Sequence, residues 1–180
     1  LGEYVKKYYP DSKSDLFAVF IERCGQMTAK NCYQAMITQH AWMFLSSFEK
    51  FREKLQMIET INMAHLGARA FDEIGGEVVQ STAFVKQKKH IPGYKGLYVR
   101  LVEPTSQQGK EDMFLRGEKQ FIAIQDNFLK IPGIAIAYWA SATLLNAFLS
   151  AEKCGETRKG MVTADNDRFL RRWFEVKLTK

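Results

Sequence analysis

The stretch AFDEIGGEVVQSTAFV, residues 70–85, places a pair of glycines between two segments that read as β-strands. Residues 59–66 alternate apolar and polar side chains before it, and residues 77–86 do the same after it. Alternation with a period of two is typical of strands, and a short glycine-containing connection commonly joins antiparallel neighbours. We therefore predict that 59–66 and 77–86 form an antiparallel pair.

Helical and strand patterns alternate ahead of this pair. Residues 14–30 have apolar side chains at helical spacing, with Ser14 as the candidate N-cap. The predicted buried face of this helix comprises Leu16, Phe17, Phe20, Ile21, Cys24 and Met27. Residues 33–38 read as a short buried strand, and Ser46 with Glu49 reads as the capping box of a second helix. This order of elements is typical of an α/β sheet.

The pattern is less regular beyond residue 90. Residues 96–103 and 119–125 read as strands, and residues 106–112 read as a polar loop. Residues 137–150 have helical spacing of apolar side chains, and residues 151–160 read as a linker. This part of the chain is therefore predicted to be mixed α+β.

Composition narrows the class of protein. The 180 residues carry a net charge of +6, which favours anionic partners such as nucleic acid, and a hydrophobic fraction of 46% supports a packed core. No apolar run approaches the roughly 18 residues of a membrane span. The three cysteines are too few and too scattered for a disulfide framework, and the three histidines lack metal-ligand spacing. We therefore expect a cytoplasmic protein without a metal site.

Two long stretches carry a resemblance to a known family. SDLFAVFIERCGQMTAKNCYQAMITQHAWMFLSSFEKFREKL resembles the segment that follows the catalytic Asn-Pro-Pro-Tyr of gamma-class adenine-specific DNA methyltransferases. The matching positions are Asp15, Leu16, Phe17, Phe20, the strand 33–38, Trp42, Phe51 and Arg52. INMAHLGARAFDEIGGEVVQSTAFVKQK is similar to the segment after it. Within the first stretch, the sequence MITQHAWMFLSSFEKFREKL resembles in particular the phage-growth-limitation methylases of BREX phage-defence systems.

The resemblance implies a fold and a division of the chain. It implies an α/β fold, the C-terminal half of a Rossmann-like methyltransferase sheet ending in an antiparallel hairpin, with a mixed α+β connector. Residues 1–90 would be the later part of the catalytic domain, 91–160 the connector, and 161–180 the start of the target-recognition region. The glycine-containing S-adenosylmethionine loop and the Asn-Pro-Pro-aromatic motif are absent from this sequence. We therefore expect an internal fragment with no catalytic residue of its own and no activity alone.

The resemblance also implies roles for individual residues. Phe71 matches the aromatic that stacks on the flipped target adenine, and Phe20 matches the one that packs on the adenine ring of S-adenosylmethionine. The alternatives are that Phe71 packs on the sheet edge and that Phe20 is a helix core residue. Candidate DNA phosphate contacts are Arg168, Arg171, Arg172, Lys88 and Lys89. Charged runs of this kind are also common as plain solvated surface.

The function implied for the parent protein is transfer of a methyl group from S-adenosylmethionine to the exocyclic amino group of an adenine in double-stranded DNA. The setting would be restriction–modification or phage defence, with other phage-defence proteins as further partners. Two alternatives stay open. One is a non-catalytic DNA-binding or specificity module, which the basic tail also allows. The other is a structural scaffold in which the hairpin and the helix at 137–150 form a partner interface, which predicts an oligomer or a partner that covers Tyr138 and Trp139.

Overall fold

The computed structural model describes residues 1–73 and 79–150. Contacts between residues divide the chain into two units, 1–150 and 151–180. The linker predicted at 151–160 and the tail predicted at 161–180 lie outside the described residues. Within the described ranges, no helix combines the length and apolar character needed to cross a membrane.

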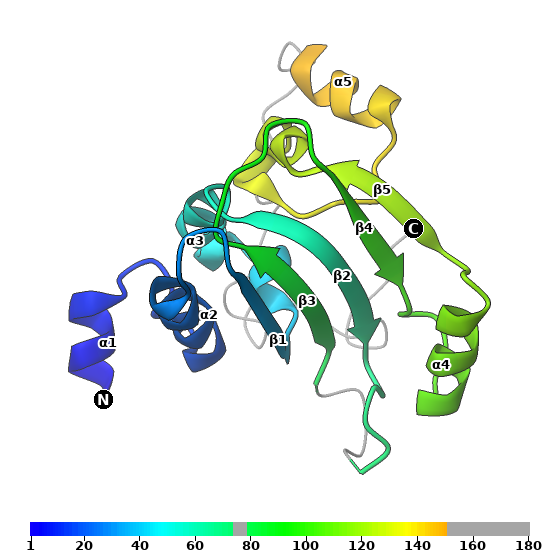
Figure 1. Cartoon of the computed structure of the whole chain (residues 1–180), viewed down its shortest axis with the longest axis horizontal. Helices are drawn as coiled ribbons and strands as arrows, with labels where there is room; N and C mark the ends of the chain where they lie inside the picture. Colours follow the sequence, from blue (N-terminus) through cyan, green and yellow to red (C-terminus); the bar gives the residue numbers. More distant parts are fainter. Residues whose placement is uncertain (74–78, 151–180) are drawn as a thin grey trace, which may run out of the picture. The chain divides into compact units, whose positions relative to one another are not determined.

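A single sheet organises the first unit, with its five strands in the order β1-β3-β2-β4-β5 (Figure 1). The strands are β1 Tyr33–Gln39, β2 Glu59–Gly67, β3 Ser81–Gln87, β4 Lys95–Arg100 and β5 Gln120–Ile124. The α-helices are α1 Gly2–Tyr8, α2 Leu16–Met27, α3 Glu49–Leu55, α4 Gln107–Leu115 and α5 Ala142–Ser150. All five predicted strands are therefore present.

Strand pairing confirms the predicted antiparallel pair and corrects its place in the sheet. β3 runs antiparallel to β2, with Phe84 opposite Met63, and it also runs antiparallel to β1 on its other side. The sheet does not end at this hairpin, because β4 pairs parallel with β2 and β5 pairs antiparallel with β4. The region predicted as a connector therefore adds two strands to the same sheet, and the functional division at residues 90 and 160 stays a prediction.

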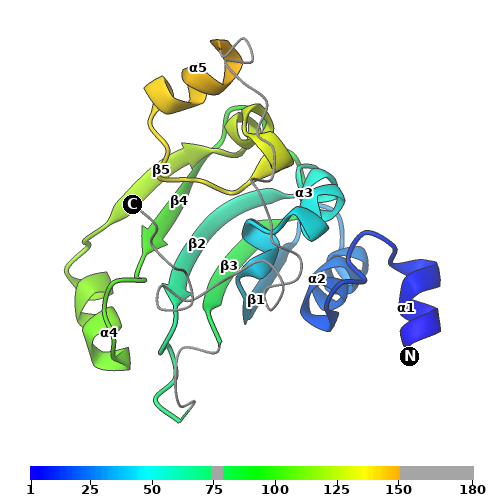
Figure 2. The ribbon, with the colours of Figure 1, turned by 180° about the vertical axis from the view of Figure 1, so that it is seen from behind.

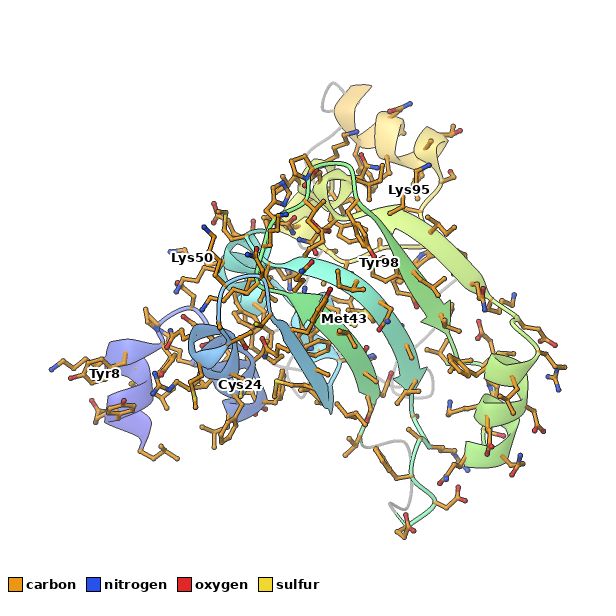
Figure 3. All side chains as sticks on the ribbon, viewed as in Figure 1. Tyr8, Cys24, Met43, Lys50, Lys95 and Tyr98 are labelled. Atoms are coloured by element: carbon orange, nitrogen blue, oxygen red, sulfur yellow. The ribbon has the colours of Figure 1, made fainter. Side chains whose placement is uncertain are left out.

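One row of large side chains crosses the whole sheet. In register, Met36 lies beside Phe84, Phe84 beside Met63, Met63 beside Tyr98, and Tyr98 beside Phe121. Side chains at neighbouring positions of adjacent strands point to the same face, so this row forms one apolar surface. It packs against Trp42, Met43 and Phe51, which are fully buried. Figure 3 shows Met43 and Tyr98 in this central layer, whereas Tyr8 lies on α1 at the periphery.

The opposite face of the sheet is open. It carries an apolar hollow lined by small and branched side chains, among them Ala35, Ile37, Ala83, Val85 and Leu97. Ile37 and Leu97 are exposed here. Figure 1 looks onto this face, and the view from behind in Figure 2 shows α3 across the other one. Among the described residues, the apolar core packs on the other face, whereas this face carries the hollow, with Phe114 of α4 at its side.

The predicted boundaries and buried face of α2 need correction. The helix begins at Leu16, and its N-cap is Asp15 rather than Ser14, because the Asp15 carboxylate accepts the N–H of Phe17 at 3.4 Å. Ile21 and Gly25 face the sheet, and Gln34 of β1 donates from its side chain to the Ile21 carbonyl at 3.0 Å. This packing turns Leu16, Phe20 and Met27 outward. Apolar spacing alone gave the wrong buried face because apolar side chains lie on more than one side of the helix.

The predicted capping box is also absent. Residues Ser46–Phe48 form a short 3-10 turn that leads directly into α3. Neither this turn nor α3 has a side-chain cap. The two segments are continuous, so the Ser46 side chain does not stand at the start of an isolated helix.

The segment predicted as a polar loop at 106–112 is the start of α4. Ser106 caps the helix, because its hydroxyl accepts the N–H of Gly109 at 3.1 Å. The Lys110 side chain is buried and donates to the carbonyls of Leu66 and Leu101, both at 2.7 Å. Lys110 therefore has a structural role, because it satisfies two carbonyls at the ends of strands. In the sequence it reads only as part of a polar segment.

Replacing Lys110 with Met should destabilise the fold. The variant keeps an unbranched side chain of similar length but leaves the Leu66 and Leu101 carbonyls without their donor. Loss of hydrogen bonds from a charged donor predicts a decrease of roughly 2 kcal/mol in the free energy of unfolding. Denaturant unfolding measures it, with Lys95→Met as an exposed control. Equal stability of the two variants would contradict this role.

Candidate functional site

Three parallel strands end at the same edge of the sheet. β1, β2 and β4 all run in one direction, so their C-terminal ends and the loops that follow them lie together; we call this the carboxyl edge. Ligands of open α/β sheets bind at this edge, where loops leave the strands. Figure 1 shows the chain continuing beyond the arrowhead of β2, and Phe71 belongs to the segment that follows this strand.

The loop between β2 and β3 is anchored to the sheet at both ends. It leaves β2 at Gly67, whose φ of +67° is strained for other residues. An added Cβ at Gly67 would also lie only 3.0 Å from the Val102 side chain. At its far end, the Gln80 carbonyl accepts the backbone N–H of His40 at 2.8 Å. The predicted glycine turn at Gly75 and Gly76 lies outside the described residues.

Phe71 lies in this loop, and its side chain is 38% exposed. The aromatic side chains of the core are almost fully buried, as in Trp42 and Phe51. An aromatic ring that a loop presents partly to solvent at a carboxyl edge is available to stack on a ligand. Its role with a flipped base stays a prediction.

A chain of hydrogen bonds runs along the same edge. The His40 ring nitrogen Nδ1 lies 2.7 Å from Nε2 of His65, and Nδ1 of His65 lies 3.0 Å from the Tyr138 hydroxyl. His65 is a buried residue of β2, two positions before the strand ends at Gly67. His40 directly follows β1. Tyr138 belongs to the segment after β5, is 3% exposed, and joins the same series of hydrogen bonds. Three distant parts of the sequence therefore meet in one polar cluster.

Aromatic and cationic groups surround the cluster. The Tyr138 ring stacks on Tyr98 at 5.0 Å, and Trp139 packs edge-on against Tyr138 at 4.9 Å. The Arg100 guanidinium lies 5.1 Å from the centre of the Trp139 ring. Phe44 lies between His65 and Trp139, with ring centres 5.8 Å from each. This packing fixes the orientation of the rings at the carboxyl edge.

Burial governs the charge state of the two histidines. The pKa of His65 is lowered from 6.5 to about 4, mainly by burial and in addition by the charges of His40 and Arg100. Burial also lowers the pKa of His40. The charged form of a histidine loses hydration when it is buried, so the neutral form is favoured. At neutral pH the cluster therefore consists of uncharged imidazoles and a tyrosine hydroxyl.

This shift predicts acid sensitivity of the fold. Because the pKa of folded His65 is depressed, its contribution is present above the unfolded value of 6.5 and is lost as pH falls towards 4. A shift of this size corresponds to roughly 3 kcal/mol across that window. We expect the free energy of unfolding to fall more steeply with acid in the wild type than in His65→Gln. Parallel curves for the two proteins between pH 7 and pH 4.5 would contradict this.

The other predicted site residues do not gather at the carboxyl edge. Phe20 is on α2 and is 58% exposed, so the alternative that it is a helix core residue is wrong. Lys88 and Lys89 follow β3 at the opposite end of the sheet, about 20 Å away at the rise of a strand. Lys88 donates there to the carbonyls of Gln26 and Thr28 at the end of α2. Their roles towards cofactor or DNA stay predictions.

Two further expectations concern the basic tail and the helix predicted at 137–150. The candidate contacts Arg168, Arg171 and Arg172 lie outside the described residues. The scaffold alternative expected a partner to cover Tyr138 and Trp139, but Tyr138 is buried within this chain and precedes α5, which begins at Ala142, whereas Trp139 is 39% exposed. The cluster of His40, His65 and Tyr138 was not predicted, because hydrogen bonds between distant segments leave no local spacing signal in the sequence.

The comparisons with known proteins give a consistent result. Residues 1–68 match the family model of the Eco57I restriction-modification methylases. The whole chain is 50% identical, over 190 aligned residues, to the adenine-specific methyltransferase PglX of Lacticaseibacillus casei (strain Zhang), of which it spans 16%. Over 99% of its length it is 44% identical to the adenine-specific methyltransferase BrxX of Escherichia coli O9:H4 (strain HS), of which it spans 15%.

These matches confirm the resemblance that the residues carry to adenine-specific methyltransferases of phage-defence systems. The match extends along the full length of this chain but covers about one sixth of the curated relatives. By sequence the chain is therefore a relative of the PglX and BrxX adenine-specific methyltransferases and corresponds to one segment of them.

Proposed function

We propose that this chain forms the target-base side of the catalytic domain of an adenine-specific DNA methyltransferase. The parent enzyme transfers the methyl group of S-adenosylmethionine to the exocyclic amino group of an adenine extruded from duplex DNA. A base inside the stack is out of reach, so such an enzyme must hold the extruded base by stacking and polar contacts. The observation that carries the proposal is the exposed Phe71 on a loop anchored at the carboxyl edge.

The open parts of the sheet support a further detail of the proposal. β1 is an edge strand of this sheet, its side chains Tyr33 and Ile37 are exposed, and one face of the sheet is an apolar hollow. Large uncovered apolar surfaces mark sites of packing against other protein. The curated relatives are about six times longer than the aligned segment. We therefore propose that this is the second half of a Rossmann-like methyltransferase sheet and that the rest of the parent protein covers it.

The described residues fit only part of an S-adenosylmethionine site. Phe20 offers an exposed aromatic surface on which an adenine ring could stack. The glycines at 67 and 96 are required by close packing, and those at 93 and 117 lie in turns with positive φ. None of these described glycines forms a loop that would cradle a cofactor. The cofactor would supply the methyl group, and we assign this chain no step beyond holding the base.

Double-stranded DNA is the proposed partner. The net charge of +6 favours a polyanion, and contacts to phosphate hold a protein in register on DNA. The basic tail with Arg168, Arg171 and Arg172 is the proposed phosphate-binding part. Lys88 is a weaker candidate, because two of its donors already bind carbonyls of the helix end.

The test of the proposed function uses the full-length protein in its own cells. DNA from cells with the intact gene is compared with DNA from cells in which the gene is deleted, by sequencing that detects N6-methyladenine. We expect methylated adenines at one recurring sequence only in the first sample. Identical adenine methylation in both samples would overturn the proposal.

A further inference from the structure

The hydrogen-bond chain at the carboxyl edge has a direction. The Tyr138 hydroxyl is buried, and among the described hydrogen bonds its side-chain partner is Nδ1 of His65, 3.0 Å away. A buried hydroxyl hydrogen needs an acceptor, so Tyr138 donates to Nδ1 of His65. The buried tyrosine thus sets the direction of the first hydrogen bond.

The remaining links follow from the chemistry of neutral imidazole. A neutral ring has one donor nitrogen and one acceptor nitrogen. If Nδ1 of His65 accepts, its Nε2 carries the hydrogen and donates to Nδ1 of His40 at 2.7 Å. His40 then carries its own hydrogen on Nε2. The reverse direction would leave the buried Tyr138 hydroxyl hydrogen without an acceptor among its described partners.

The His40 end of this series of hydrogen bonds lies at the carboxyl edge, where the Phe71 loop also begins. The backbone N–H of His40 binds Gln80 at the end of that loop, and β2 carries His65 two residues before the loop begins at Gly67. His40 is half-buried, so part of the residue is exposed to solvent. Phe71 and His40 therefore lie on segments that follow β2 and β1 at the same carboxyl edge.

We propose that His40 contacts the extruded adenine, donating from Nε2 to a ring nitrogen of the base. His65 and Tyr138 are positioning residues, which hold the His40 imidazole in the tautomer that makes Nε2 a donor. This inference rests on the proposed function and assigns it a specificity residue. The carboxyl edge thereby supplies both stacking, from Phe71, and a polar contact, from His40.

The neutral state of His40 selects the class of acceptor. Phosphate is bound mainly by charged Arg and Lys, whereas base edges are read by matched donors and acceptors. The ring nitrogens of adenine accept hydrogen bonds, and its exocyclic amino group donates. A donor of fixed tautomer therefore suits the adenine ring, and it also disfavours guanine wherever it faces N1, which is protonated in guanine.

The test couples protein variants to base analogues in the full-length enzyme. Single-turnover methylation is measured on duplexes whose target base is adenine, 1-deazaadenine, 3-deazaadenine or 7-deazaadenine. One analogue lacks the contacted nitrogen and is expected to slow the wild type by roughly three- to tenfold, the range for one hydrogen bond. His40→Ala should show the same loss with adenine and no further loss with that analogue. His90→Ala, at the opposite end of the sheet, should keep the wild-type pattern.

Two further variants separate contact from packing. His40→Gln retains an N–H donor on a side chain of similar reach, so it should recover part of the rate with adenine. Tyr138→Phe keeps the aromatic ring but removes the hydroxyl that orients His65, so it should reduce the sensitivity to the critical analogue. A purely structural role would change the melting temperature without changing the sensitivity to any analogue.

The outcomes distinguish this inference from the proposed function. If every analogue slows His40→Ala as much as it slows the wild type, His40 makes no contact with the base and the inference fails alone. It also fails alone if His40→Ala methylates adenine at the wild-type rate. If the wild type methylates no adenine at all, the proposed function fails and the inference fails with it.

Discussion

Phe71→Ala in the full-length enzyme is expected to lower the methylation rate on intact duplex DNA by roughly tenfold to a hundredfold, because stacking of a base on an aromatic contributes about 1–3 kcal/mol. The fold should survive, because the side chain is 38% exposed and lies in a loop. A buried Phe→Ala change would instead cost about 3–5 kcal/mol of stability. Methylation kinetics and the melting temperature, measured on the same variant, separate the two roles.

A mispaired target base provides the internal check for Phe71. Mispairing lowers the cost of extrusion, so it should restore part of the rate of Phe71→Ala. Phe148→Ala is the matched control, because Phe148 is similarly exposed and lies on α5, outside the Phe71 loop. A variant that unfolds, or that methylates intact duplex at the wild-type rate, would show that Phe71 has no stacking role.

Arg52→Ala is expected to have the largest effect on stability. The side chain is 1% exposed and donates to three backbone carbonyls, those of Trp42, Leu45 and Gly133, at 2.6–2.9 Å. It thereby joins α3 to two loops that pack over the core. Each carbonyl left unsatisfied costs about 1–3 kcal/mol, so the loss should be roughly 3 kcal/mol or more. Denaturant unfolding of the domain measures this loss.

Two comparisons sharpen the Arg52 prediction. Arg52→Lys should restore little stability, because a single ammonium group cannot reproduce the planar fork of donors that reaches all three carbonyls. Lys50→Ala, on the exposed side of the same helix, should change stability by less than about 0.5 kcal/mol. An Arg52→Lys variant as stable as the wild type would show that charge, rather than the geometry of the guanidinium, is what the site requires.

Local patterns predicted most of the sheet and little of the polar interior. The alternation in residues 59–66 and the glycines after them were sufficient for β2, β3 and their antiparallel pairing. The same patterns could not show that β4 pairs parallel with β2, because that depends on contacts between segments distant in sequence. Periodicity identifies an element, whereas its neighbours in the sheet are chosen by packing of the whole chain.

The missed features share a physical cause. Lys110 and Arg52 look like surface residues in sequence, yet both are buried because their donors satisfy strand-end or loop carbonyls. His40 and His65 lack metal-ligand spacing and give no other local signal, although their rings bond between the ends of β1 and β2, which β3 separates in the sheet. By contrast, Phe71 was proposed from its matching position in a known family, and the structure shows that it is partly exposed. Its role towards a base stays a prediction, whereas the polar cluster became visible only in the structure.

The central claim is that the Phe71 loop at the carboxyl edge holds the extruded base, and photo-cross-linking tests it most directly. Once the methylated sequence is known, its target adenine is replaced by 5-iodouracil, and the duplex is irradiated with the full-length protein and digested with trypsin. Cleavage after Arg69 and Lys86 releases the peptide AFDEIGGEVVQSTAFVK, which begins one residue before Phe71. The account predicts that this peptide carries the cross-linked nucleotide at Phe71. A cross-link confined to peptides from other parts of the protein would contradict it.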